Sequence, residues 1–379
     1  MAEFQDVVRF LDDISTWLIP GADCIIYHKG KQVFRHQSGY ADVEAKTPLT
    51  SDHLFFLYSA SKMITCTAAL QLFERGKFLL TDPVSAYLPE FSDMTVLRHI
   101  DGKTEQVKAK NQITVGQLFS MTAGLNYELD TPEIRAVREK TGGKCPTREI
   151  ARAIAQQPLS FEPGTHWQYS LCHDVLGALI EVVSGQRFGQ YLQEHIFDPL
   201  GMCRTGFAYD SAVEAKMAQQ YEYKDELNRY ERVELKNRFR LGSEYESGGA
   251  GLISCADDYI LFANALCNGG STAAGERILS RRTIDLMRTN HLDAVSMRDF
   301  DWPHLTGYGY GLGVRTMVDR ARGGSLSPVG EFGWDGAAGA YALIDPENQL
   351  AVFYIQHMLN GKHPYIHPRL RNIVYQCLS

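Results

Sequence analysis

The pattern of apolar positions opens the chain with a helix and a hairpin. Apolar residues recur at i, i+3, i+4 and i+7 between Phe4 and Leu18, which predicts an amphipathic helix. Short apolar runs at residues 25–27 and 32–35 flank the turn residues 28–31, and this arrangement predicts a β-hairpin. The chain therefore begins with one helix followed by two antiparallel strands.

A strand that passes directly into a helix comes next. Residues 54–57 form an apolar run of strand character, and residues 63–73 carry apolar side chains at helical spacing before Gly76. Ser59 stands at this transition, and Lys62 lies one helical turn later on the same face. The helix dipole and partial burial are expected to lower the pKa of the Lys62 amine, which could then accept the serine proton. A Ser-x-x-Lys pair also arises by chance, so partners elsewhere must support this hypothesis.

The middle of the chain favours helices, and its last hundred residues return to strands. Helices are predicted at 81–88, 114–120, 146–155, 174–183 and 188–195, with a hairpin inserted at 95–107. Loops and short strands are predicted in the polar, tyrosine-rich stretch 221–245. A helix running to residue 266 is predicted after the glycine cluster 248–251, then strands at 308–317, 340–344 and 350–356 and a helix at 364–378. The cluster lacks a P-loop pattern and indicates a tight turn with close backbone approach.

Strands at both ends and helices between them predict the α+β class. We expect an antiparallel sheet flanked by helices and built from both chain ends, with an inserted mainly helical lobe. The sheet domain is placed at residues 1–64 and 246–379, and the helical domain at 65–245. The active site is expected in the cleft between the two domains.

Composition excludes several classes of function. The 379 residues carry a net charge of −7, so there is no basic surface for nucleic acid or an anionic membrane. No apolar run reaches membrane-spanning length, and the N-terminus has no signal-peptide pattern. The eight cysteines form no C-x-x-C pair, which indicates buried free thiols and a reduced, cytoplasmic setting.

Two further stretches carry candidate chemistry. Tyr169 lies in a polar turn at 163–170 before a helix. A neighbouring lysine would lower the pKa of its phenol and make Tyr169 a possible general base. The alternative is a tyrosine that only packs against its neighbours. Residues 331–339 are rich in glycine and alanine and predict an edge strand that a substrate can approach. A backbone N–H there could join that of Ser59 in an oxyanion hole, and a glycine bulge beside a packed Trp334 is the alternative.

These three stretches together resemble the serine β-lactamase and penicillin-binding superfamily. The similarity is to the branch of class C β-lactamases, D-alanyl-D-alanine carboxypeptidases and family VIII carboxylesterases, and it covers nearly the whole chain. Further similar segments lie at 76–84, 113–125, 197–202 and 248–262. The resemblance implies a β-lactamase/transpeptidase-like fold.

The resemblance also implies roles for individual residues. Ser59 would be the nucleophile, Lys62 and Tyr169 its proton-transfer partners, and the amides of Ser59 and Ala337 the oxyanion hole. The substrate-binding residues expected from it are Tyr58, Leu171, Trp334, Asp335 and Gly336. It implies no cofactor and no metal.

Two departures from the family pattern bear on the substrate. Tyr169 is followed by Ser170-Leu171 where lactamases carry Tyr-x-Asn, and Trp334 stands where they carry a lysine or histidine. That cation binds a substrate carboxylate, a contact worth about 1.5–3 kcal/mol, unless another basic residue such as Arg240 or His357 replaces it.

We therefore predict a cytoplasmic serine hydrolase that cleaves carboxylic esters through an acyl-enzyme. A penicillin-binding peptidase or β-lactamase, an acyltransferase and a non-catalytic receptor on the same fold are the alternatives. The expected partner is a small-molecule ester or amide, without nucleic acid or membrane, and a homodimer is left open. Whether Lys62 or Tyr169 is the base in acylation also stays open.

Overall fold

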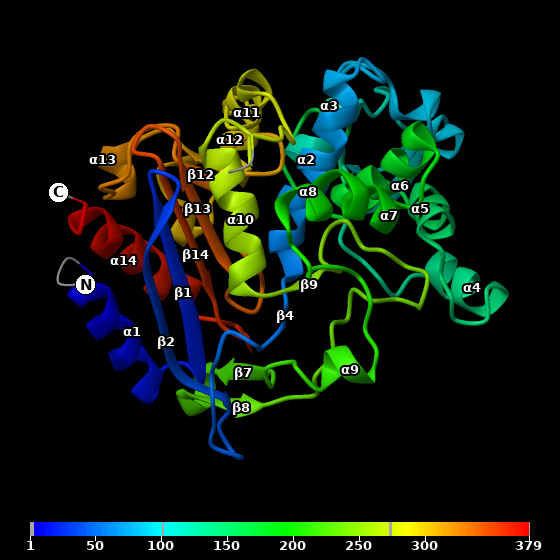
Figure 1. Ribbon diagram of the computed structural model, residues 1–379. Coiled ribbons are helices and arrows are strands. Elements are labelled where there is room, and N and C mark those ends of the chain that lie inside the picture. The colour runs from blue at the N-terminus through cyan, green and yellow to red at the C-terminus, as the bar shows by residue number, and fades with distance from the viewer. Residues whose placement is uncertain (1–3, 101, 273–274, 379) are drawn as a thin grey trace.

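The chain forms one large antiparallel sheet with helices on both faces and a second group of helices beside it (Figure 1). The computed structural model describes residues 4–100, 102–272 and 275–378. The sheet has the strand order β10-β11-β12-β13-β14-β1-β2-β3, and its paired strands run antiparallel. Its strands come from both ends of the chain, so the predicted α+β class with a sheet built from both ends is confirmed.

The strands of the large sheet are β1 (Gly21–His28), β2 (Lys31–Asp42), β3 (Thr47–Pro48), β10 (Tyr308–Tyr310), β11 (Arg315–Met317), β12 (Phe332–Gly333), β13 (Tyr341–Asp345) and β14 (Leu350–Ile355). Smaller sheets contain β4 (Phe55–Phe56) with β9 (Ile253–Ser254), β5 (Thr95–Ile100) with β6 (Lys103–Lys108), and β7 (Tyr221–Lys224) with β8 (Arg229–Arg232) and β15 (Met358–Leu359).

The α-helices are α1 (Gln5–Trp17), α2 (Ser61–Glu74), α3 (Val115–Ser120), α4 (Pro132–Lys140), α5 (Thr147–Ala155), α6 (Cys172–Ser184), α7 (Phe188–Leu192), α8 (Asp198–Leu200), α9 (Ser211–Glu214), α10 (Ala256–Cys267), α11 (Arg281–Met287), α12 (Ser296–Asp299), α13 (Arg320–Gly323) and α14 (His363–Gln376). Short helical turns are η1 (Tyr58–Ala60), η2 (Val84–Ala86), η3 (Pro89–Phe91), η4 (Gln193–Phe197), η5 (Asp225–Leu227) and η6 (Pro303–Leu305).

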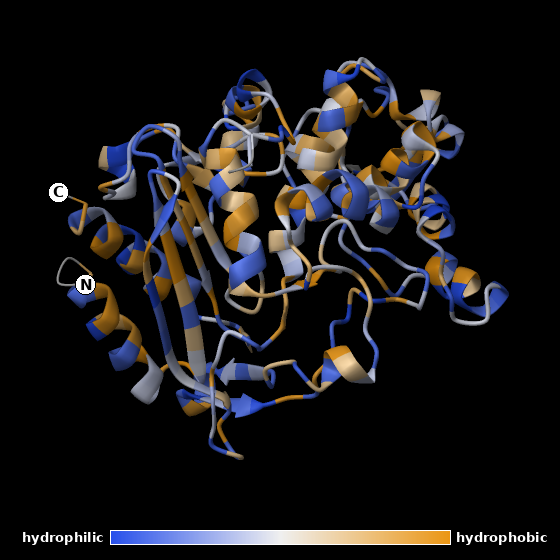
Figure 2. Cartoon of the chain, viewed as in Figure 1, coloured by the Kyte–Doolittle hydropathy of each residue, from blue (hydrophilic) through white to orange (hydrophobic). Residues whose placement is uncertain are grey.

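The central strands β1 and β14 are buried on both faces, because successive side chains point to opposite sides of the sheet. Ile25 and Phe353 face α10, where Tyr259 stacks on Phe353 with 4.2 Å between ring centroids. Cys24 and Tyr354 face α1 and α14, which pack beside each other on the outer face. Both outer helices carry apolar residues along one side only, as Figure 2 shows.

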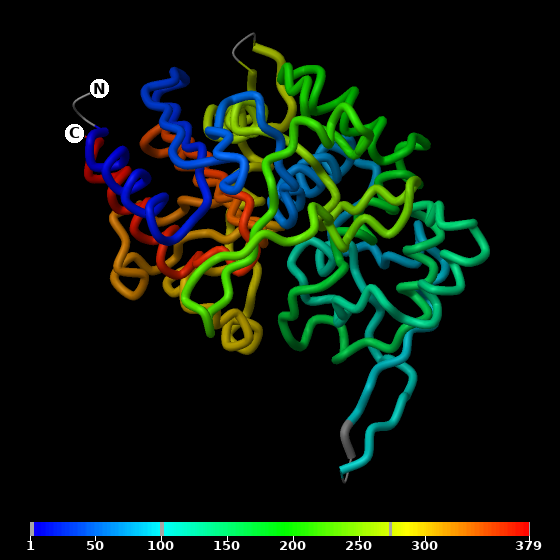
Figure 3. Tube along the Cα trace, turned by 90° about the horizontal axis from the view of Figure 1, so that it is seen from below, coloured from blue at the N-terminus to red at the C-terminus, as the bar shows by residue number. Residues whose placement is uncertain are grey.

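Helix α2 occupies the centre of the molecule. All of its residues from Ser61 to Leu72 are buried, and it packs against α6 and α7. A helix buried on every side shows little amphipathic pattern, in contrast to the outer helices. The helical group continues outward from α2 to the hairpin β5–β6, which projects away from the rest of the molecule (Figure 3).

Most predicted elements are present, including the first helix, its hairpin, the Ser59 helix, the inserted hairpin and the closing helix. Four predictions need correction. The helix predicted at 81–88 is only the short turn η2, and the helix expected straight after the glycine cluster begins at Ala256, beyond β9. The strand predicted at 308–317 is two strands, β10 and β11, because Gly311 and Gly313 approach Met287 and Cys66 too closely for a side chain.

The fourth correction concerns residues 331–339, which do not form an edge strand. Strand β12 pairs with β11 on one side and β13 on the other. Position 333 requires glycine, because the Cβ atom of any other residue would lie only 2.0 Å from the Ala342 carbonyl oxygen. The domain boundaries given above stay a prediction.

Two general predictions can be compared with the structure. All eight cysteines lie in the described part of the chain, where none of them forms a disulfide, and seven are buried. Within the same part of the chain, no helix is both long and apolar enough to span a membrane.

Candidate active site

Ser59 lies in η1, between the short strand β4 and the central helix α2. Strand β4 is held by pairing with β9. The preceding residue, Tyr58, has a φ of 47°, in the left-handed region that a bulky residue rarely adopts. Its hydroxyl accepts a hydrogen bond from the Gln220 side chain at 2.7 Å, and its ring packs edge-on against Phe56 and Phe239. These contacts hold a strained backbone directly before Ser59.

Lys62 is fully buried on α2, and its amine lies among three oxygens. The Nζ atom is 3.2 Å from Ser59 Oγ, 3.1 Å from the Tyr127 hydroxyl and 2.7 Å from the Gly249 carbonyl oxygen. Burial lowers the pKa of Lys62 to about 8, although the Asp174 carboxylate opposes the shift. The sequence-based expectation of a lowered lysine pKa therefore agrees with the structure.

The glycine cluster 248–251 makes the close backbone approach that its sequence predicts. A Cβ atom on Gly249 would lie 2.5 Å from Asp174 Oδ2 and 3.3 Å from Lys62 Nζ. Asp174 in turn accepts hydrogen bonds from the Tyr245 hydroxyl at 2.7 Å and from Ser247 Oγ at 2.5 Å. Only glycine allows the main chain to contact Lys62 at this point.

Tyr169 lies over Lys62 and against Trp334. Lys62 Nζ is 4.5 Å from the centre of the Tyr169 ring, and the tyrosine stacks on Trp334 at 5.7 Å. Trp334 Nε1 donates a hydrogen bond to the Tyr169 hydroxyl at 3.0 Å. Burial raises the pKa of Tyr169 well above its ordinary value, against the hydrogen bonds with Ser59 and Trp334. The expectation that a nearby lysine lowers this pKa is wrong, because desolvation of the phenol outweighs the cation.

Tyr127 is a second tyrosine at the site, and the sequence analysis missed it. Its hydroxyl lies 3.1 Å from Lys62 Nζ, and its ring centre is 5.4 Å from that of Tyr169. Burial raises the pKa of the Tyr127 phenol. Tyr127 belongs to an irregular segment after α3, where no periodic pattern marks it.

The stretch after β12 brings Ala337 next to Ser59. A Cβ atom on Gly336 would lie 2.2 Å from the Leu57 carbonyl oxygen, so this glycine permits contact between two backbone segments. Two cavities flank the site, and Ser59, Tyr169 and Ala337 line both of them.

The first cavity measures about 390 Å³ and has an aromatic and histidine-rich wall. Its other lining residues are Trp302, Pro303, His304, Trp334, Asp335, Gly336 and His363. The second cavity measures about 480 Å³ and has basic residues at its rim. Its other lining residues are Tyr58, Tyr127, Lys236, Arg238, Phe239 and Leu359.

Most of the predicted substrate-binding residues line these cavities. Trp334, Asp335 and Gly336 lie in the first cavity and Tyr58 in the second. Leu171 does not belong to either lining; it is 1% exposed, caps α6 and packs in the main core.

Burial favours the neutral form of Asp335, but His304 and His363 hold the pKa of its carboxyl well below the ordinary value.

The cations weighed as replacements for the missing lysine or histidine lie elsewhere. The Arg240 guanidinium donates to the carbonyl oxygens of Gly251 and Phe207. His357 is buried beside the Ala218 carbonyl oxygen, and burial lowers its pKa to about 4. Other basic side chains line the cavities: His304 and His363 in the first, and the exposed Lys236 and Arg238 in the second.

Comparison with known proteins gives matches along almost the full chain. The family model described as Beta-lactamase matches residues 14–374. Protein Rv1367c of Mycobacterium tuberculosis is 31% identical over 349 residues, covering 90% of this chain and 86% of the relative. Esterase EstB of Burkholderia gladioli is 29% identical over 380 residues, covering 94% of this chain and 90% of the esterase. The solved structure of EstCE1, a hydrolase with promiscuous acyltransferase activity, superposes with a TM-score of 0.79 at 27% identity, covering 99% of both chains.

Proposed function

Because this chain belongs to the Beta-lactamase family, we propose that it is a serine hydrolase that cleaves carboxylic esters through an acyl-enzyme on Ser59. The observation that carries the proposal is the 3.2 Å approach of the buried Lys62 amine to the Ser59 hydroxyl. Similarity to an esterase and to a hydrolase with promiscuous acyltransferase activity over nearly the whole chain supports the same assignment.

The residues then act in the following order. Neutral Lys62 takes the proton of Ser59 Oγ while that oxygen bonds to the ester carbonyl carbon. The amides of Ser59 and Ala337 hold the oxyanion. When the carbonyl re-forms, the C–O bond to the alcohol breaks, and the alcohol leaves with the proton from Lys62. Water then attacks the acyl-enzyme by the same route, releasing the acid and restoring Ser59.

Lys62 serves as the base and Tyr169 as a hydrogen-bond donor in this scheme. With a pKa of about 8, a useful fraction of Lys62 is neutral near neutral pH. Tyr169 stays protonated because burial raises its pKa. The phenol can therefore donate to the departing alkoxide, while the Trp334 indole fixes its orientation.

The test is a comparison of a short-chain p-nitrophenyl ester with a chromogenic cephalosporin under one set of conditions. We expect the ester to have the larger kcat/KM, because Trp334 stands at the position where lactamases carry the lysine or histidine that binds a β-lactam carboxylate. A cephalosporin kcat/KM equal to or above that of the best ester would contradict the proposal and favour a β-lactamase.

Acyl transfer is the second candidate function, and the match to a hydrolase with promiscuous acyltransferase activity favours it. Adding an alcohol to the assay should then yield a new ester at the expense of the free acid. Product analysis by chromatography distinguishes transfer from hydrolysis. We also propose a cytoplasmic setting and a small-molecule substrate, and we leave a homodimer to be tested by solution mass measurement.

A further inference from the structure

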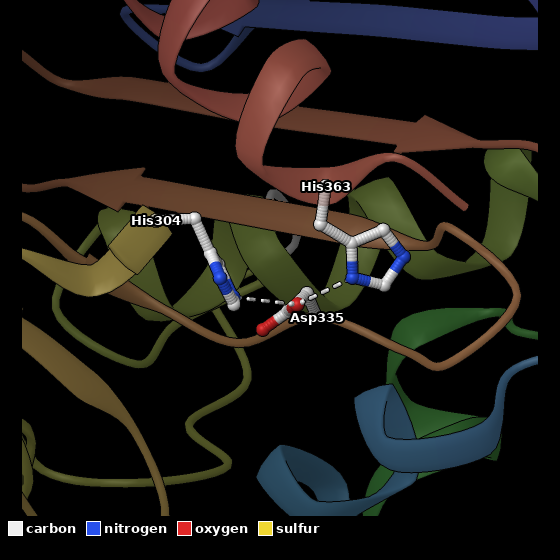
Figure 4. Close-up of side chains that lie close together, drawn as sticks. All are labelled: His304, Asp335 and His363. Carbon is white, nitrogen blue, oxygen red and sulfur yellow. Dashed lines mark ion pairs between the residues drawn. The ribbon is translucent and has the colours of Figure 1, made fainter. Parts of the chain in front are cut away.

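One wall of the first cavity contains two histidines and an aspartate from three separate segments. His304 lies in η6, Asp335 follows β12, and His363 begins α14. Figure 4 shows both imidazole rings directed towards the carboxylate. His304 Nε2 and His363 Nδ1 lie 3.6 Å and 3.2 Å from Asp335 Oδ2, and one donor atom from each residue falls within 4.8 Å of the others.

Several buried histidine nitrogens in and beside this cluster have no hydrogen-bond partner among the described residues. The His304 Nε2 atom is buried and has no hydrogen-bond partner within the described residues. Asp335 is 7% exposed, and a buried carboxylate is costly unless it is paired or coordinates a metal. One helical turn after His363, His367 is 3% exposed, and neither of its nitrogens has a hydrogen-bond partner among the described residues, although Nδ1 lies 4.0 Å from Asp335 Oδ2.

Ring stacking holds the imidazoles in place together with their contacts to Asp335. His367 stacks on His363 with 4.6 Å between centroids and an interplanar angle of 16°. His367 also stacks on Tyr341, with 4.4 Å between the ring centroids. On the other side, His304 stacks on Trp302 with an angle of 15°. Fixed donor orientations of this kind favour binding of an ion with defined geometry.

We propose that His304, Asp335 and His363 bind one divalent transition-metal ion of the zinc class. Two ligands at the usual bond lengths of 2.0–2.2 Å in a tetrahedral site are about 3.3 Å apart, close to the 3.2 Å and 3.6 Å found here. Two imidazoles and one carboxylate suit zinc rather than calcium or magnesium. Three protein ligands leave one position open.

That open position borders the cavity that also contains Ser59, since all three ligands line the first cavity. Water or an anionic oxygen of a bound molecule can occupy it. The ion has no part in the proton transfers of Ser59 and Lys62, so this inference stands apart from the proposed esterase activity. Metal binding can also be measured without turnover, so each idea can fail alone.

The first test titrates the chelator-treated full chain with zinc chloride against a competing chromophoric indicator. We expect one ion per chain, and at least about 100-fold weaker binding in His304→Asn and His363→Asn, since even outer-sphere changes cost 10–100-fold. The matched control is His166→Asn, because His166 pairs with Asp299 at 3.0 Å in the same His–Asp manner outside the cluster. That variant should bind zinc as the parent does.

A second test replaces zinc with Co²⁺ and records visible absorption. The parent should show the intense d–d bands of a four- or five-coordinate ion, and Asp335→Asn should lose them. His304 and His363 are partly exposed, so their variants should fold, and circular dichroism checks this. A parent that binds no zinc stoichiometrically and gives only the spectrum of aqueous Co²⁺ would overturn the proposal, whatever the variants do.

Discussion

Ser59, Tyr169 and Ala337 line both cavities, but all the other lining residues of the two cavities differ. The first has tryptophans, two histidines and a buried aspartate, supplied mostly by the C-terminal part of the chain. The second has exposed Lys236 and Arg238, together with tyrosine and phenylalanine side chains. The shared residues are those proposed for the chemistry, and the differing walls are those that a substrate would distinguish. Changes to the shared set should therefore stop catalysis, whereas changes to one wall should alter selectivity.

The largest effect is expected from Ser59, one of the three residues that line both cavities. Ser59→Ala should lower ester hydrolysis by about 10³-fold or more, because no nucleophile remains to form the acyl-enzyme. Initial rates with a p-nitrophenyl ester measure this. Ser61→Ala is the matched control, since the Ser61 hydroxyl accepts a hydrogen bond from the Leu252 N–H and lines neither cavity. Activity of Ser59→Ala within tenfold of the parent would exclude it as the nucleophile.

The proton-transfer partners should come next. Lys62→Met and Tyr169→Phe should each lower kcat by about 10²–10⁴-fold. The double variant should lose far less than the product of the two, because the two residues are proposed to act on the same step, Lys62 moving the proton and Tyr169 donating a hydrogen bond. Strictly multiplicative losses would show that the two act independently and would contradict this shared role.

The sequence alone predicts the site residues whose contacts lie within one local element. Ser59 and Lys62 share one turn of a helix, so their contact follows from spacing alone. The polar turn at 163–170 marked Tyr169 as a candidate, and the family resemblance then implied the roles of Tyr169 and Ala337. Tyr127 comes from an irregular segment 65 residues away from Lys62, and only folding brings them together. The one local sign of the histidine wall was the i, i+4 spacing of His363 and His367 on α14.

Errors in the predictions have physical causes of the same kind. The strand at 308–317 is interrupted because Gly313 lies against Cys66 of α2, a contact that no local pattern contains. The fall expected in the pKa of Tyr169 ignored burial, which depends on the packing of Trp167, Trp302 and Trp334 around its ring. Tertiary packing determined both outcomes.

The pH dependence should separate the two proton-transfer partners. If neutral Lys62 is the base, kcat/KM should rise about tenfold per pH unit below a midpoint near pH 8 and level off above it. The folded-state pKa of about 8 lies below the ordinary 10.5, so the unfolded chain binds more protons between these values. The free energy of unfolding should therefore rise with pH across this window, and Lys62→Met should flatten that rise. A rate that keeps rising well above pH 10, by contrast, would indicate the tyrosine, because burial raises the pKa of Tyr169 well above its ordinary value.

A change in the aromatic wall of the first cavity should lower kcat by a smaller factor. Trp334→Phe keeps an aromatic ring beside Tyr169 but removes the Nε1–H donor at 3.0 Å. A neutral hydrogen bond is worth about 0.5–1.5 kcal/mol, so kcat should fall by about tenfold or less. Trp302→Phe is the comparison, because Trp302 packs edge-on against Tyr169 at 5.2 Å without that bond. An equal loss of kcat in both variants would attribute the effect to packing.

The smallest effect belongs to the basic rim of the second cavity. An ester whose acyl chain ends in a carboxylate should use Arg238, whereas its methylated, neutral counterpart should not. Exposed charge pairs are worth about 0.2–1 kcal/mol, so Arg238→Ala should lower kcat/KM for the acidic ester by about 2–5-fold. Added salt should weaken the parent's preference by screening. Arg135→Ala removes an exposed charge from α4 and should change neither substrate. Equal kcat/KM losses for the acidic and neutral esters in Arg238→Ala would show that the guanidinium shapes the cavity without recognising charge.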